Sequence, residues 1–172
     1  GRPEAVVANY LRSCQVVGGS FAYPIIGDYF RLLDVSVESG QGDLPVPLKP
    51  ARIVLEIAPV FECSDIGAHV LIEDPLGQRI LGLNSGDFTT GVRASADSEV
   101  VITFDVEELP LSPGPFNLRV WAKSKPDSLV EQLALVPFEV ATSQVYGCRE
   151  LSRIWHGPAV TRASVDVVSR SV

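Results

Sequence analysis

Apolar and polar residues alternate with a period of two along most of the chain, which is typical of strands that bury one face and expose the other. This alternation predicts strands at residues 31–38, 52–57, 68–73, 79–83, 100–106, 116–121 and 129–140. Within the first of them, Leu33, Val35 and Val37 are expected to share a face. Weaker β character returns at residues 146–155 and 160–168.

Turn-forming residues separate the predicted strands, as in Asp74-Pro75-Leu76-Gly77. No long helical pattern lies between the strands, so a parallel α/β sheet is disfavoured. Seven or more short strands joined by such turns predict an all-β fold, an antiparallel immunoglobulin-like β-sandwich.

The beginning of the chain has a different pattern. Val6, Val7, Tyr10 and Leu11 form a helical stripe, and Pro3 suits a first helical turn. We therefore expect a short N-terminal helix and a linker at residues 1–20, a sandwich at residues 21–157, and a C-terminal strand or tail at residues 158–172. The chain contains no Met, which we interpret as the mark of a segment excised from a larger protein.

Composition narrows the possible partners. The chain has 14 Lys and Arg against 21 Asp and Glu, a formal charge of −7, which argues against binding to nucleic acid. There is no apolar stretch long enough for a transmembrane helix and no signal-peptide character at the start. Cys14, Cys63 and Cys148 are odd in number and widely spaced, so thiols in a reducing cytoplasm are expected rather than disulfides or a metal site.

Catalytic chemistry is not expected from this segment. His69 and His156 have no His or Cys neighbour at ligand spacing, so we predict no metal and no cofactor here. Asp105, Glu107 and Glu108 are clustered, but a solvated strand end explains them better than a glycosidase pair. A nucleotide-binding P-loop is absent from the sequence.

One strand carries a pattern that suits carbohydrate recognition. Asn117, Arg119, Trp121 and Lys123 share a face of the strand at residues 116–121 and just beyond. Sugars bind against an aromatic ring, with planar amide or guanidinium groups on their hydroxyls. The candidate carbohydrate-binding residues are Trp121, Arg119, Asn117 and His69. Alternatively, the tryptophan packs under a loop or at a subunit interface.

An ordered set of short motifs resembles one known family. The motifs are PEAVVANYL at residues 3–11, GAHVLIED at 67–74, GQRILGLNS at 77–85, FDVEELPLSPGPFNLRV at 104–120 and FEV at 138–140, followed by Gly147 and Trp155. Together they resemble the C-terminal domain of the ATP-binding subunit of Wzt-type ABC transporters, which export O-antigen. The family usually has Tyr where Phe116 stands in its LPLxPGxYxLxV hairpin.

The resemblance implies a cytoplasmic domain at the inner membrane that binds the O-polysaccharide cargo of lipopolysaccharide, often through its terminal modification. It implies a homodimer, sometimes with an exchanged C-terminal strand, and contact with the membrane subunit through an ATPase domain that holds ATP and Mg²⁺. Two alternatives remain open: a structural or dimerisation domain without glycan affinity, and a secreted immunoglobulin-like or carbohydrate-binding module.

Overall fold

The computed structural model describes residues 24–39, 44–88, 91–96, 98–124, 129–143 and 157–159. The expected N-terminal helix, the strands expected at residues 146–155 and 160–168, and His156 lie outside these ranges. So do Cys14 and Cys148.

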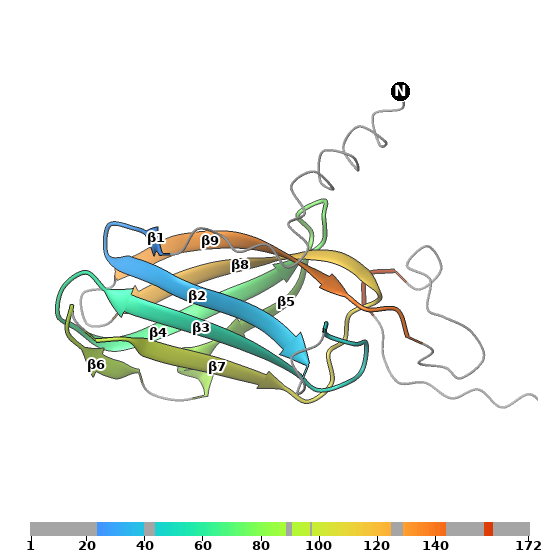
Figure 1. Cartoon of the computed structure of the whole chain (residues 1–172), viewed down its shortest axis with the longest axis horizontal. Coiled ribbons are helices and arrows are strands. Elements are labelled where there is room, and N and C mark those ends of the chain that lie inside the picture. Colours follow the sequence, from blue (N-terminus) through green and yellow to red (C-terminus); the bar gives the residue numbers. More distant parts are fainter. Residues whose placement is uncertain are drawn as a thin grey trace, which may run out of the picture.

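The described residues form two antiparallel sheets packed face to face (Figure 1). The elements are β1 (Ile25–Ile26), β2 (Phe30–Ser39), β3 (Ala51–Pro59), β4 (Cys63–Glu73), β5 (Arg79–Asn84), the 3₁₀ helix η1 (Ser85–Asp87), β6 (Val92–Ala94), β7 (Val100–Val106), β8 (Gly114–Ser124) and β9 (Leu129–Val140). The four-stranded sheet has the order β1-β2-β3-β7, and the five-stranded sheet has the order β5-β4-β8-β9 with β6 also paired to β4. The predicted all-β antiparallel architecture is confirmed. β1 and β6 were not predicted, because strands this short do not show a period of two.

The core lies between the two sheets because each strand turns its apolar side inward. On β3, Ile53, Leu55 and Ile57 are fully buried. They belong to one hydrophobic cluster with Val70 on β4 and Leu118 on β8. Burial of one face of every central strand leaves the two outer faces free for different roles.

A bulge in β2 alters the predicted pattern of its side chains. The pairing of β2 with β3 shifts between Leu32 and Asp34, so Leu33 has no partner in the register. Val35 and Val37 pack against the core, whereas Leu33 does not belong to that cluster. The prediction therefore holds for the two valines and fails for Leu33, because an extra residue interrupts a period of two.

Two connections follow the predicted turn chemistry. In the β4–β5 turn, the Asp74 carboxylate accepts hydrogen bonds from the Leu76 and Gln78 backbone N–H groups, each at 2.9 Å. Gly77 has φ of 80° and Gly114, which begins β8, has φ of 121°. Glycine suits both positions because it lacks the Cβ that disfavours positive φ.

Glu131 of β9 fastens the five-stranded sheet to the start of the four-stranded one. Its carboxylate accepts hydrogen bonds from the backbone N–H groups of Asp28, Tyr29 and Phe30 at 2.6, 3.0 and 3.0 Å. A side chain at Gly27 would collide with this carboxylate, since a Cβ there would lie 2.5 Å from it. One acidic side chain thus caps a turn and bridges the sandwich.

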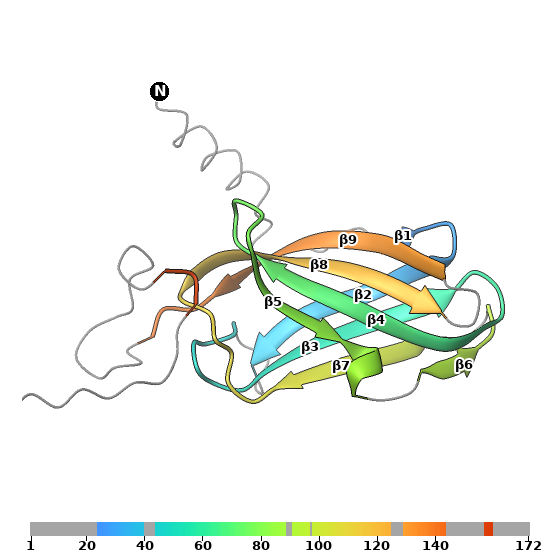
Figure 2. The ribbon, with the colours of Figure 1, turned by 180° about the vertical axis from the view of Figure 1, so that it is seen from behind.

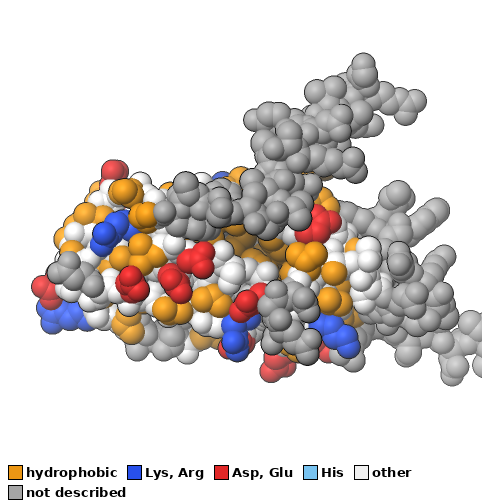
Figure 3. Space-filling view, viewed as in Figure 1, with side chains coloured by type: hydrophobic (Ala, Val, Ile, Leu, Met, Phe, Trp, Pro, Cys, Tyr) orange, Lys and Arg blue, Asp and Glu red, His pale blue; other side chains and the backbone are white. Residues whose placement is uncertain are grey.

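The outer face of the four-stranded sheet carries acidic side chains, among them Asp34, Glu56 and Asp105. Figure 3 shows carboxylates spread over this side of the molecule, with hydrophobic side chains between them. Asp34 pairs with Glu56 across β2 and β3, and Arg52 forms an exposed ion pair with Asp105 at 2.8 Å. Asp105 is therefore engaged with a cation on this face.

Candidate functional site

The outer face of the five-stranded sheet, which is turned toward the viewer in Figure 2, carries the predicted carbohydrate-binding residues. Side chains of β8 that point into the core are at most 1% exposed: Phe116, Leu118, Val120 and Ala122. The intervening side chains are only partly covered and lie on the outer face: Asn117, Arg119, Trp121 and Lys123. The predicted division of this strand into two faces is confirmed.

The strand register brings residues that are distant in sequence side by side. His69 of β4 pairs with Trp121, and Glu73 pairs with Asn117. The imidazole of His69 stacks on the Trp121 indole, with ring centroids 5.3 Å apart and planes inclined by 21°. On the other side of Trp121, the register places Gln132 of β9. We call this surface the Trp121 face; it consists of His69, Glu73, Asn117, Arg119, Trp121, Lys123 and Gln132.

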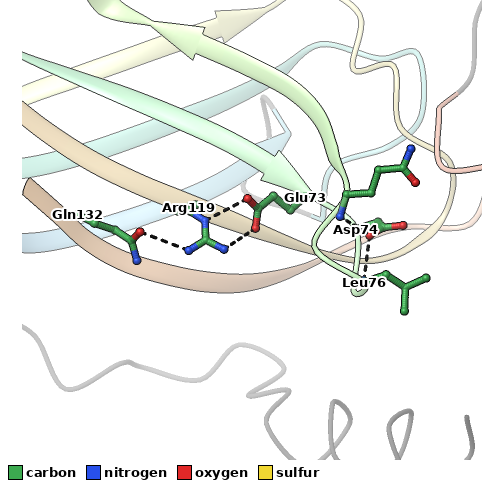
Figure 4. A network of polar contacts seen from close by, with 6 residues as sticks. Glu73, Asp74, Leu76, Arg119 and Gln132 are labelled. Carbon is green, nitrogen blue, oxygen red and sulfur yellow. Dashed lines mark hydrogen bonds and ion pairs between the residues drawn. The ribbon is translucent and has the colours of Figure 1, made fainter.

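Arg119 is held in a fixed orientation at the centre of the Trp121 face (Figure 4). Its Nε and Nη2 donate to the two carboxylate oxygens of Glu73 at 3.0 and 2.7 Å, and its Nη1 donates to Gln132 Oε1 at 3.3 Å. The guanidinium carbon lies 5.8 Å from the centre of the Trp121 ring, within range of a cation–π contact. The hydrogen bond with Glu73 raises the pKa of Arg119 above its ordinary value.

The burial of Glu73 makes this ion pair different from an ordinary surface pair. Glu73 is 4% exposed, so its charge needs the two guanidinium hydrogen bonds as compensation. A bidentate pair also fixes the plane of the guanidinium. Arg119 consequently presents a stable edge to any ligand that lies over Trp121.

A second polar contact borders the Trp121 face near the end of β5. Lys123 Nζ donates to Asn84 Oδ1, which also accepts from the Gly86 backbone N–H at 3.2 Å. Burial, followed by the positive charges of Lys123 and Arg79, lowers the pKa of His69 below 6.5. The lowered pKa favours the neutral imidazole, which has both a donor and an acceptor nitrogen.

Sequence reasoning missed two members of this face. Gln132 was not predicted because the pairing of β8 with β9 shifts after Val120. This shift interrupts the alternation of inward and outward side chains. Glu73 was not singled out, because its hydrogen bonds with Arg119 depend on which strands are neighbours. Glu73 could have been placed on the same face as His69, because the two residues are four positions apart on one strand.

The described ranges offer little for other kinds of chemistry. No cluster of three or more His, Cys, Asp or Glu side chains in them is arranged to hold a metal ion. Cys63 is a buried cysteine on β4. Nothing helical among these residues has the length and apolar character of a transmembrane span.

The fold and this surface define an all-β sandwich domain with a polar outer sheet face built around an aromatic ring. The particular fold is that of the C-terminal domain of Wzt: its crystal structure superimposes with a TM-score of 0.65 at 14% sequence identity, covering 85% of this chain and 88% of that one. The resemblance seen in the motifs is thus confirmed at the level of the fold.

Other comparisons are weaker. A Niemann-Pick type C2 protein from the Japanese carpenter ant superimposes with a TM-score of 0.45 at 9% identity, over 70% of this chain and 98% of that one. No protein-family model and no curated protein sequence matches the chain.

Proposed function

We propose that this chain is a non-catalytic carbohydrate-recognition domain that binds O-antigen polysaccharide, at its terminal part, for export by an ABC transporter. The observation that carries the proposal is the Trp121 face: a partly exposed indole, a stacked imidazole and a guanidinium held by Glu73. The fold shared with the C-terminal domain of Wzt supports the transporter context.

The chemistry of the Trp121 face suits a neutral, hydroxyl-rich ligand. The positive charge of Arg119 is already matched by Glu73, so a strongly anionic ligand has less to gain here than a sugar. Amide and guanidinium N–H groups can donate to hydroxyl oxygens, while the indole contacts the C–H face of a sugar ring. Such sites bind reversibly, as cargo selection requires.

The proposal includes no reaction in this segment. The carboxylates of Glu73 and Asp105 are each paired with an arginine, which favours binding over acid–base catalysis. ATP and Mg²⁺ are assigned to an ATPase domain of the full protein, through which this domain would reach the membrane subunit. The proposed location is the cytoplasmic side of the inner membrane.

The immunoglobulin-like description is part of the proposal. The orders β2-β3-β7 and β5-β4-β8-β9 correspond to strands A-B-E and C′-C-F-G of an immunoglobulin domain. This correspondence supports an immunoglobulin-like description of the sandwich.

A dimerisation domain without glycan affinity is the second candidate. β9 ends the order of the five-stranded sheet, and Val130 and Leu135 on it are exposed apolar residues. No described strand pairs with the outer edge of β9, and an edge with apolar side chains suits pairing with a second copy. Light scattering that shows a dimer, together with no glycan signal, would favour this candidate.

Calorimetric titration with the source organism's own O-polysaccharide tests the proposal. The native chain is expected to bind saturably, and Trp121→Ala is expected to lose about tenfold in affinity, because an aromatic contact worth about 1.4 kcal/mol is removed. Phe61→Ala is the matched control, because Phe61 is an exposed aromatic residue remote from this face. Equal affinity of the two variants would contradict the proposal.

A further inference from the structure

A cavity of about 420 Å³ opens between the edges of the two sheets, away from the Trp121 face. β7 forms one wall, and the end of β5, η1 and β6 form the other. β7 ends the order of the four-stranded sheet, and β5 ends that of the five-stranded sheet. No described strand joins the two sheets along this side, and the cavity reaches from the exposed Val101 to the buried Phe104.

The inner wall of this cavity is apolar. Ile66, Val100 and Phe104 are buried core residues that also line it, and Leu83 and Ile102 add further aliphatic surface. Ligand pockets are commonly about 300–1,000 Å³, and an apolar cavity of about 150 Å³ already accepts benzene. The space here is large enough for a longer hydrocarbon group.

The mouth of the cavity carries exposed apolar side chains and no uncompensated charge among its described residues. Phe88, Val101 and Val92 are 73%, 59% and 50% exposed. Asp105 borders the mouth, but its carboxylate is paired with Arg52 at 2.8 Å. An apolar ligand entering here would cover the exposed side chains without removing an unpaired charge from water.

Polar groups lie at one end of the mouth. Ser85 lines the cavity and its Oγ accepts a hydrogen bond from the Ala68 backbone N–H at 3.0 Å, which leaves the hydroxyl hydrogen for a ligand. Asn84, the preceding residue, contacts Lys123 on the outer face. The turn at η1 thus separates an apolar chamber from a polar surface.

We propose that this cavity binds the aliphatic chain of an amphiphile, with the polar head of the ligand at Ser85. The inference does not depend on glycan binding, because its cavity and the Trp121 face share no residue. Two kinds of head group suit the polar end, a carboxylate and a sugar, and they can be told apart by experiment.

The test is a methyl-detected NMR titration of the full chain with two probes, decanoate and octyl glucoside, each below its micelle concentration. Binding in the cavity is expected to shift the methyl signals of Ile66, Leu83, Val92 and Ile102 saturably, and to leave that of Leu76 unchanged. Decanoate binding alone indicates a carboxylate head, and stronger octyl glucoside binding indicates a sugar head. Absence of saturable shifts with both probes would overturn the proposal.

Two matched variants locate the site. Phe88→Ser is expected to weaken chain binding by about tenfold, since about 1.4 kcal/mol of apolar contact is removed. Leu76→Ser removes another exposed apolar residue, in the β4–β5 turn, and should bind as the native chain does. Equal affinity of Phe88→Ser and the native chain would overturn the proposal.

Two further measurements distinguish chain binding in the cavity from glycan binding at the Trp121 face and from dimerisation. Trp121→Ala is expected to keep native affinity for the chain probes, so failure of glycan binding leaves the inference standing. If a second copy fills the cavity instead, light scattering would show a dimer that Phe88→Ser converts to monomer. The probes would then not enter the cavity, and this result would overturn the proposal.

Discussion

The two outer faces of the sandwich contain ion pairs of different kinds. On the four-stranded sheet, the side chains of Arg52 and Asp105 are 52% and 70% exposed. On the five-stranded sheet, those of Arg119 and Glu73 are 27% and 6% exposed. Exposed pairs are screened by water and gain little, whereas a buried carboxylate depends on its partner.

This difference in exposure indicates which face holds its side chains in fixed positions. Water can replace either partner of the Arg52–Asp105 pair, so that face tolerates motion and substitution. Glu73 cannot exchange its partner for water without cost, so Arg119 is kept in place beside Trp121. A preformed arrangement loses less conformational entropy when a ligand binds.

The largest expected effect on stability comes from the more buried ion pair, Arg119–Glu73. Glu73→Ala should lower the free energy of unfolding by about 2–3 kcal/mol, less than for a fully buried pair because Arg119 is partly exposed. Urea denaturation followed by far-UV circular dichroism measures the change. A loss no greater than that caused by Asp105→Ala would remove the distinction between the two faces.

The next effect concerns the link between the sheets. Glu131→Ala should lower the free energy of unfolding by about 1–2 kcal/mol, because three backbone N–H groups lose their carboxylate and turn to water. The same urea series measures it, and amide exchange of Asp28, Tyr29 and Phe30 should quicken. Unchanged exchange at these residues would show that the carboxylate does not hold the turn.

A smaller effect is expected from the titration of His69. Its folded-state pKa is lowered by burial, so the unfolded chain binds the proton more readily and stability falls as pH drops below 6.5 toward the folded pKa. Urea midpoints from about pH 7.5 to about pH 5.5 should show this slope, and His69→Gln should reduce it in a His156→Gln background. If the urea midpoint has the same pH dependence with and without His69→Gln, a group other than His69 causes it.

The smallest effect is predicted for the exposed pair. Asp105→Ala should leave the urea midpoint within the scatter of repeat measurements, because both partners remain solvated after the change. The hydrogen bond with Asp105 raises the pKa of Arg52 above its ordinary value. A clear loss of stability in low salt that disappears in high salt would mean that the acidic face is more strongly coupled than its exposure suggests.

The sequence predicted those parts of the fold that depend on local alternation. β8 was predictable because Phe116, Leu118 and Val120 follow an uninterrupted period of two. The assignment failed at Leu33, where an inserted residue changes the register. Short strands such as β1 offer too few residues for any period to be recognised.

The candidate site was predictable only within single strands. Asn117, Arg119 and Trp121 lie on one strand, so their shared face follows from parity alone. The contact of Arg119 with Glu73 and Gln132 requires knowledge of which strands are neighbours and in what register. The cavity beside β7 was not predictable at all, since its walls belong to strands of different sheets.

The fluorescence of Trp121 during titration with the O-polysaccharide tests the central claim most directly. In a Trp155→Phe background, Trp121 is the one remaining tryptophan of the chain, so its emission reports on this face alone. A saturable change in emission, with the same midpoint as calorimetry, is the predicted result. Calorimetric binding without any change in Trp121 emission, or no binding at all, would contradict the assignment of the Trp121 face as the glycan site.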